Sequence, residues 1–388
     1  VSDVPIGSYV SGGIDSSLVL KILSEQQNFS GDCFHGQFSE HKDCNESKFA
    51  ISASNFSNAE INITDIKAND FIKNFDKLIY HLDYPTAGPG SFPQFMVAQN
   101  ASKKVKAIIG GQGGDELFGG YARYLIAYFE QCIKAAIDGN YKNGNFVVTI
   151  ESIIPNLTVL KSYKPLISSL WSKGLFEEMS LRYFKLINKS DEMTNEIKWN
   201  DLNTTATLDK FLKIFDNEAN TKKNAYFDKM THFDFKCLLP ALLHVEDRVS
   251  MAFGLETRVP FLEHNLVEFL AKIPADIKFK NGKLKYLLTN TFKNKIPPEI
   301  LKRKDKMGFP VPLNSWFKNE LFEYLNDNLS NMAVKQRPFI NGKNITNELG
   351  KEKKFSRKYW ALLSLEIWFQ QFFDNFKYNS KVHNFKEI

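Results

Sequence analysis

The feature that most constrains this fold is a glycine turn that separates a short apolar run from a helical pattern. Residues 4–10 read VPIGSYV, the turn is Ser11-Gly12-Gly13, and apolar side chains recur at helical spacing through residues 14–27. A strand that passes through a tight turn into a helix is the repeating unit of parallel sheets. The N-terminal segment therefore predicts an α/β fold.

The same unit recurs through the first 120 residues, after which strand signals become sparse. We expect strands at 4–10, 33–38, 59–63 and 106–111 and helices at 14–27, 46–56, 71–80 and 92–103. These units predict a mostly parallel sheet with helices on both faces, followed by a mostly helical C-terminal part. We place the α/β core at 1–140 and the helical part at 141–388. The aromatic segment 359–373 predicts a late helix packed in a core.

The first glycine turn has the composition of a phosphate-binding loop. Two glycines allow the backbone to approach an anion without a Cβ clash, and the following helix offers unpaired N–H groups at its N-terminus. The turn lacks the lysine of a Walker A loop. The residues expected to hold phosphate are Ser11, Gly12, Gly13, Ser16 and Ser17.

A second glycine turn, GGQGGDELFGGY at 110–121, follows the fourth expected strand. The carboxyl ends of parallel strands meet at one edge of a sheet, so Asp115 of this turn should face Asp15 of the first. Two carboxylates beside phosphates are chemically sensible where they hold Mg²⁺, since the ion bridges negative groups. Asp15 and Asp115 are therefore the predicted metal ligands. Glu116 can be a catalytic carboxylate or simply a partner of the helix dipole.

Composition narrows the class of protein. The 34 Phe, 14 Tyr and 5 Trp are too much apolar surface for a disordered chain, and no apolar run is long enough to span a membrane. A net charge of +6 over 388 residues fits an anionic small molecule better than nucleic acid, which usually meets a clustered basic stripe. The four cysteines match no zinc spacing and no signal peptide is visible, which favours reduced thiols in a cytoplasmic protein.

Several motifs together resemble one family. The chain is similar to the synthetase domain of glutamine-hydrolysing asparagine synthetases, which belongs to the N-type ATP pyrophosphatases with an adenine nucleotide alpha hydrolase-like fold. The aromatic segment 359–369 looks like the C-terminal end of that domain. The segments that carry the resemblance are 4–19, 110–121, 246–252 (EDRVSMA), 256–263 (ETRVPFLE), 285–288 (KYLL) and 303–310 (RKDKMGFP).

The resemblance implies a two-step amidation. ATP and a substrate carboxylate give an acyl-adenylate and pyrophosphate, and ammonia then gives an amide and AMP. In the family, ammonia comes from an N-terminal glutaminase domain, and nothing like that domain is in this chain. The first strand starts close to Val1. We therefore expect a fragment, cut at the junction with a glutaminase domain that is its partner in the parent chain.

The resemblance also implies individual roles. Val10 and Gly36 match positions that contact the nucleotide base, and Gly110 and Gly111 match positions where the backbone approaches ATP; strand core is the alternative for the first two. Lys285 matches a lysine that stabilises charge near the α-phosphate, with a surface lysine as the alternative.

Other motif residues have two interpretations each. Arg303 and Lys306 can form a basic lid or be solvated. Asp247 and Arg258 can shape the substrate site or form a buried ion pair. Apolar helix faces can serve a core or an interface, so a homodimer stays open.

One position departs from the family pattern. Residue 112 is Gln, where asparagine-forming members carry a Glu that assists adenylate formation, and Gln cannot accept a proton as a base. We nevertheless predict Gln112 to be a catalytic residue, together with Lys285 and Asp115. Aspartate is the leading acceptor, and the alternatives are a polysaccharide uronic acid or a lactam-forming amino acid. A decayed nucleotide-binding module and a tRNA-modifying enzyme are the rivals from other classes.

Overall fold

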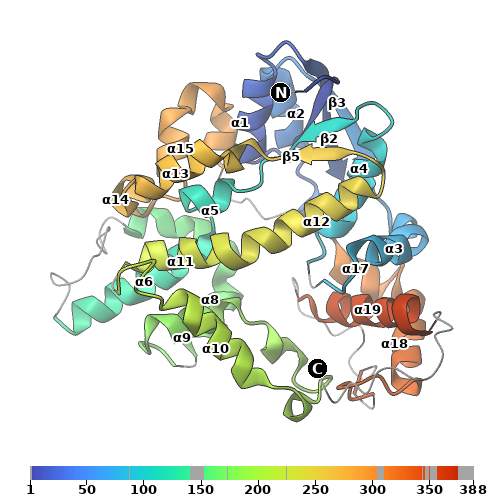
Figure 1. Ribbon diagram of the computed structural model, residues 1–388. Helices are drawn as coiled ribbons and strands as arrows, with labels where there is room; N and C mark the ends of the chain where they lie inside the picture. Colours follow the sequence, from blue (N-terminus) through green and yellow to red (C-terminus); the bar gives the residue numbers. More distant parts are fainter. Residues whose placement is uncertain are drawn as a thin grey trace.

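The computed structural model describes residues 2–86, 88–139, 153–172, 174–223, 225–303, 310–342, 344–345, 349 and 356–374. Its centre is a five-stranded parallel sheet in the order β3-β2-β1-β4-β5 (Figure 1). The strands are β1 (Ile6–Tyr9), β2 (Phe29–Gln37), β3 (Glu60–Asp65), β4 (Ala107–Ile109) and β5 (Glu256–Arg258). The parallel sheet predicted from the alternating units is confirmed, and its central strands β1 and β4 both end at a glycine turn.

The fifth strand was not anticipated. β5 pairs with β4 in parallel, with Ala107 opposite Glu256 and Ile109 opposite Arg258. It is three residues long and lies almost 150 residues after β4, so neither length nor an alternating pattern announces it. The sheet is therefore completed by a segment from late in the chain.

Helices cover both faces of the sheet, as expected. Neighbouring residues of β2 show the two faces, because successive side chains of a strand point to opposite sides. Cys33 packs in one cluster with residues of α1 (Ile14–Leu23) and α2 (Ser47–Phe56). Phe34 packs in another with residues of α4 (Ser91–Ala101).

The remaining described residues are mostly helical. The π-helical segment η6 (Asp234–Leu238) joins α11 to α12 in one long run from the helical layer to the sheet (Figure 1). Helix α12 contacts α3, α4 and β5. The helices are α3 (Ala68–Leu82), α5 (Gly114–Phe118), α6 (Ala122–Ile137), α8 (Lys164–Trp171), α9 (Met179–Ile187), α10 (Thr204–Phe215), α11 (Tyr226–Phe233), α12 (Leu239–Met251), α13 (His264–Lys272), α14 (Ala275–Lys278), α15 (Tyr286–Thr291), α16 (Pro298–Leu301), α17 (Leu313–Lys318), α18 (Phe322–Val334) and α19 (Lys358–Phe369).

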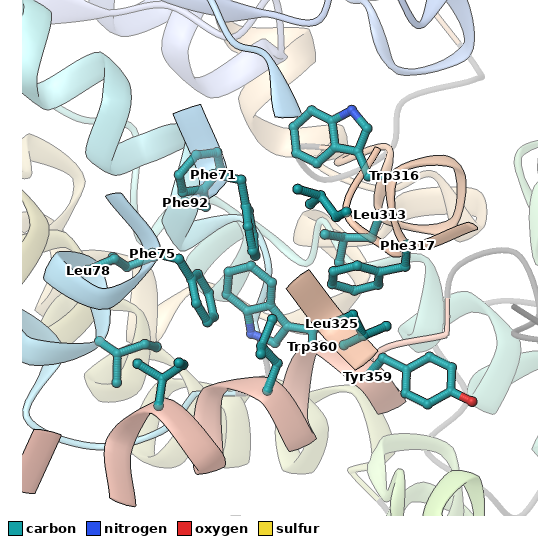
Figure 2. Close-up of a cluster of buried hydrophobic side chains, with 14 of the residues drawn as sticks. Phe71, Phe75, Leu78, Phe92, Leu313, Trp316, Phe317, Leu325, Tyr359 and Trp360 are labelled. Carbon is teal, nitrogen blue, oxygen red and sulfur yellow. The ribbon is translucent and has the colours of Figure 1, made fainter. Parts of the chain in front are cut away.

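The aromatic C-terminal segment forms the predicted core helix. Trp360 of α19 is fully buried and meets Phe75 of α3 edge to face, with ring centroids 5.1 Å apart. Phe75 in turn stacks on Phe71 at 4.4 Å, and Trp316 of α17 closes the cluster from the other side (Figure 2). Aromatic pairs of this geometry add to the apolar area that they bury. The cluster fastens the end of the chain to α3, beside the sheet.

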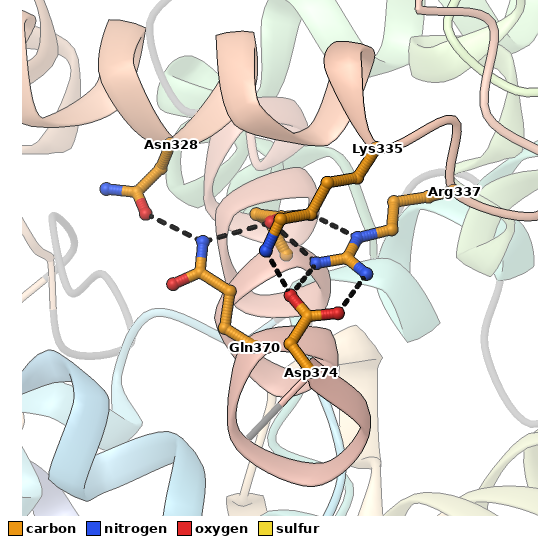
Figure 3. Close-up of polar contacts among 6 residues, drawn as sticks. Asn328, Lys335, Arg337, Gln370 and Asp374 are labelled. Carbon is orange, nitrogen blue, oxygen red and sulfur yellow. Dashed lines mark hydrogen bonds and ion pairs between the residues drawn. The ribbon is translucent and has the colours of Figure 1, made fainter. Parts of the chain in front are cut away.

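A buried ion-pair network holds the ends of α18 and α19 together (Figure 3). The guanidinium of Arg337 donates two hydrogen bonds of 2.9 Å to Glu366, which is fully buried on α19. It also donates to Asp374, at 2.7 and 2.6 Å, and these bonds lower the pKa of Asp374 to about 2. Lys335 is a second, more exposed partner of Asp374.

No described helix is long and apolar enough to cross a membrane. None of the four cysteines, all of which lie in the described part of the chain, forms a disulfide, and Cys33 and Cys132 are buried.

We predict that Arg337→Met destabilises the protein by about 3 kcal/mol, because it leaves the carboxylate of Glu366 buried without its cation. Urea unfolding followed by circular dichroism measures the loss. The control is Lys335→Met, which removes a half-exposed partner of the same network and should cost less than about 1 kcal/mol. Equal losses for the two variants would contradict this account of the network.

Candidate functional site

The first glycine turn is shaped by its own side chains. The hydroxyls of Ser11 and Ser16 lie 2.9 Å apart, and the Ser11 N–H donates to the Ser16 hydroxyl at 3.1 Å. Gly12 has φ +72°, and a Cβ there would lie 2.5 Å from the Cβ of Phe49 on α2. Gly13 caps α1 without a side-chain hydrogen bond. The N–H groups of the first helical turn are therefore available to an anion.

Lys285 joins the two glycine turns. Its side chain is only 4% exposed, and its ammonium forms ion pairs with Asp15 and with Oδ1 of Asp115, the second at 2.5 Å. Burial alone would lower the pKa of Lys285, but the charges of Asp115 and Asp15 raise it above its usual value. Lys285 therefore stays positively charged. The surface-lysine alternative is wrong, because the residue is buried at the start of α15 in a left-handed conformation with φ +53°.

Two glycines make this close approach possible. A Cβ on Gly120 would lie 1.9 Å from Oδ1 of Asp115 and 2.1 Å from Cε of Lys285. A Cβ on Gly114 would lie 2.6 Å from Oδ1 of Asp15. Any side chain at either position would push the charged groups apart, so packing around these groups explains Gly114 and Gly120.

The predicted base-contacting residues lie at the ends of β1 and β2. The Val10 N–H donates to the carbonyl of Phe34 at 2.9 Å, and its carbonyl meets Nδ1 of His35 at 2.9 Å. Burial lowers the pKa of His35, so the ring is neutral at pH 7 and donates from Nδ1 to Val10. Gly36 is buried and pairs with Thr64 of β3. No sequence pattern singles out His35, which fixes the end of β1 beside the phosphate loop through its bond to Val10.

Gln112 meets a buried carboxylate that the sequence did not single out. Its amide nitrogen donates to Oε2 of Glu246 on α12, which also accepts from Gln94 on α4. Glu246 is fully buried, and burial raises its pKa to about 7. A Cβ on Gly110 would lie 2.1 Å from Oε1 of Gln112, so the glycine makes room for this amide. The missing carboxylate of residue 112 is thus replaced, nearby, by one from α12.

Gly111 places the contact between Gln112 and Glu246 directly beside the phosphate loop. A Cβ on Gly111 would lie 3.2 Å from the Cβ of Asp15 and from the N atom of Ser16. Ser17 of α1 is buried, and its hydroxyl has no hydrogen-bond partner among the described residues. The predicted phosphate-loop and second-turn residues therefore surround one location.

Arg303 lies against the phosphate loop. Its guanidinium is 4.1 Å from the ring centroid of Phe49, forms an ion pair with Glu46, and approaches the Gly12 carbonyl at 3.5 Å. The side chain is 5% exposed, so the solvated alternative is wrong for Arg303. Lys306, the other residue expected in a basic lid, lies outside the described residues.

The other motif residues lie around this centre in different environments. Asp247 is exposed on α12. Arg258 forms an ion pair of 2.8 Å with Glu256 on the edge strand β5. This pair lies within one strand and does not have the buried geometry expected of an ion pair between helices. Glu116 is buried and accepts a hydrogen bond of 2.5 Å from Tyr121. Burial raises the pKa of Glu116. The carboxyl group of Glu116 is therefore packed between α5 and Tyr121.

The residues at the centre can accommodate a nucleotide-bound Mg²⁺. Oδ1 of Asp15 is buried and has no partner among the described residues, while Oδ2 meets Lys285. No cluster of three or more His, Cys, Asp or Glu suited to a metal occurs in the described part of the chain. Mg²⁺ usually takes one or two carboxylates and completes its shell with phosphates and water. The donor set therefore fits an ion that arrives with phosphate.

Comparisons with known proteins found a matching family and several similar proteins. The family model described as asparagine synthase matches residues 1–370. Glutamine-hydrolyzing asparagine synthetase 1 of Bacillus subtilis is 28% identical over 379 residues, which cover 95% of this chain and 56% of that protein. The amidase chyE of Penicillium rubens is 24% identical over 414 residues, which cover 92% of this chain and 56% of that protein. The chain spans about half the length of the curated relatives that it matches.

We predict that Glu246→Gln stabilises the protein above neutral pH. The folded-state pKa of about 7 lies above the value of an unfolded glutamate, so the wild type loses stability as pH rises through 7. The gain in unfolding free energy of the variant over the wild type should grow by roughly 3 kcal/mol between pH 5 and pH 8. Urea titrations at both pH values measure this gain. Asp247→Asn, at the exposed neighbour, is the control, and a gain independent of pH would refute the buried charge.

Proposed function

Because the chain belongs to the asparagine synthase family, we propose that it amidates a carboxylate with ATP through an acyl-adenylate. The observation that carries the proposal is the ammonium of Lys285, buried between Asp15 and Asp115 where the two glycine turns meet. A permanent positive charge at this point can neutralise the pyrophosphate that leaves when ATP is cleaved between its α and β phosphates.

The phosphate loop supplies binding. The first turn of α1 offers N–H groups and the positive end of a helix dipole, and the hydroxyls of Ser11, Ser16 and Ser17 add donors. The ends of β1 and β2, at Val10 and Gly36, are where the nucleotide base is proposed to lie. Mg²⁺ held by Asp15 and Asp115 would neutralise phosphate charge and help orient the leaving group.

The proposed reaction balances in two steps. An oxygen of the substrate carboxylate bonds to the α-phosphorus, and the bond from that phosphorus to the bridging oxygen of the β-phosphate breaks. Lys285 stabilises the negative charge that collects on the departing pyrophosphate. The nitrogen of ammonia then bonds to the acyl carbon, the carbon–oxygen bond to AMP breaks, and the nitrogen loses a proton.

The acceptor is proposed to be aspartate, which would make asparagine. Two observations support the alternative acceptors, a uronic acid or a lactam-forming amino acid. Residue 112 is Gln, bonded to Glu246, and one similar protein is named an amidase. A decayed nucleotide-binding module would need a damaged centre, whereas Lys285, Asp15 and Asp115 form a complete set of ion pairs.

We also propose that ammonia comes from glutamine, hydrolysed by a glutaminase domain of the parent protein. The similar Bacillus subtilis protein supports this source, since its name describes it as glutamine-hydrolyzing and this chain covers 56% of its length. Free ammonium chloride should replace that source in a test of the chain alone.

We predict that the chain, given ATP, Mg²⁺, ammonium chloride and aspartate, releases AMP and pyrophosphate in equal amounts and forms asparagine. Coupled pyrophosphate detection and chromatography of the nucleotides measure both products. Parallel reactions with glucuronic acid and a β-amino acid identify the acceptor if aspartate is inactive. Release of ADP and phosphate would contradict cleavage between the α and β phosphates.

We predict that Lys285→Met lowers pyrophosphate release by about 10³-fold or more, because the leaving group loses a preorganised, desolvated charge. The matched control is Lys283→Met, two residues earlier and exposed, which should stay within about twofold of the wild type. Circular dichroism and the melting temperature show whether the variant is folded. A folded Lys285→Met with wild-type turnover would remove Lys285 from the mechanism.

A further inference from the structure

Four buried oxygen atoms around Glu246 have no hydrogen-bond partner among the described residues. They belong to side chains of β1, α12, β5 and the second glycine turn, and burial of an unpaired polar atom is costly enough that each needs an explanation. The atoms are Oε1 of Glu246, Oε1 of Gln112, the hydroxyl of Tyr9 and the hydroxyl of Thr257.

Glu246 is the hub of this group. Gln112 donates to its other oxygen. The charge of Glu246 raises the pKa of Tyr9 further above the value that burial already gives, and the phenol is therefore neutral. The hydroxyl of Thr257 lies close enough to lower the pKa values of both Glu246 and Tyr9, but it makes no hydrogen bond of full geometry with either.

The surroundings leave Glu246 without a cation. No lysine or arginine of the described residues forms an ion pair with it, and the charge of another carboxylate, Asp247, raises its pKa further. The polar partners that do meet its oxygens are the amides of Gln94 and Gln112. A small guest that brings positive charge and several N–H donors would satisfy this group.

We propose that Tyr9, Gln112, Glu246 and Thr257 form a site for ammonium, the nitrogen source of the amidation. This proposal rests on the proposed function for its role, but the binding itself does not. Ammonium has four N–H donors, and the structure offers four unpaired oxygens, one of them on a carboxylate. The group adjoins the phosphate loop through Gly111, whose Cβ position is 3.2 Å from Asp15.

The site also supplies a proton acceptor. Ammonium gives one proton to Oε1 of Glu246, which leaves ammonia with a free electron pair. The nitrogen bonds to the acyl carbon as the carbon–oxygen bond breaks, and the second proton leaves with the phosphate oxygen of AMP. Glu246 thereby performs the proton transfer that Gln112 cannot.

Binding is tested without any reaction, by melting the chain at pH 8 in ammonium chloride or tetramethylammonium chloride of equal concentration. The larger cation cannot donate N–H hydrogen bonds. At an ammonium concentration about ten times the dissociation constant, we expect the melting temperature of the wild type to be about 2 °C higher than in tetramethylammonium. The melting temperature of Glu246→Gln should be the same in the two salts. Equal melting temperatures in the two salts for the wild type would overturn the site.

The role in catalysis is tested by the dependence of turnover on ammonium. Glu246→Gln should raise the KM for ammonium at least tenfold and that for ATP less than twofold, and Tyr9→Phe should raise the KM for ammonium by a smaller factor. The control is Glu268→Gln, an exposed glutamate of α13, which should leave both KM values within twofold of the wild type. If ammonium raises the melting temperature but the chain shows no turnover, the proposed function is refuted while the ammonium site is supported. An unchanged KM for ammonium in Glu246→Gln would overturn the role of Glu246.

Discussion

The ion pairs of Lys285 with Asp15 and Asp115 are the interaction on which the rest of the structure depends. They tie the turn after β1, the turn after β4 and the start of α15, which lie far apart in the sequence. One ammonium between two carboxylates leaves a net negative charge. A polyanionic nucleotide can approach such a centre closely only with a cation between them, which is the electrostatic reason for proposing Mg²⁺.

The glycine turns made most of this centre predictable from sequence. Each follows a strand, and parallel strands bring their carboxyl ends to one edge, so Asp15 and Asp115 had to face each other. The contact of Lys285 with both could not be derived from periodicity, because it depends on a left-handed residue at the start of a six-residue helix. It came instead from a resemblance in the KYLL segment.

Two features escaped the sequence for physical reasons. β5 has only three residues, and its pairing with β4 is set by α12, which carries the chain back to the sheet. Glu246 reads as an ordinary helical glutamate, and its burial arises only when α12 packs on α4. Gln112 looks like a loss of function in sequence, whereas in space its amide is bonded to a carboxylate whose pKa is near neutrality.

The central claim is that this centre joins the substrate acid to the α-phosphate of ATP. The direct measurement uses the accepted acid with ¹⁸O in its carboxylate and determines the mass of the nucleotide product. An acyl-adenylate transfers one carboxylate oxygen to AMP, so the account predicts AMP that carries a single ¹⁸O and pyrophosphate that carries none. Label in inorganic phosphate or in pyrophosphate, or unlabelled AMP beside a labelled amide, would contradict it.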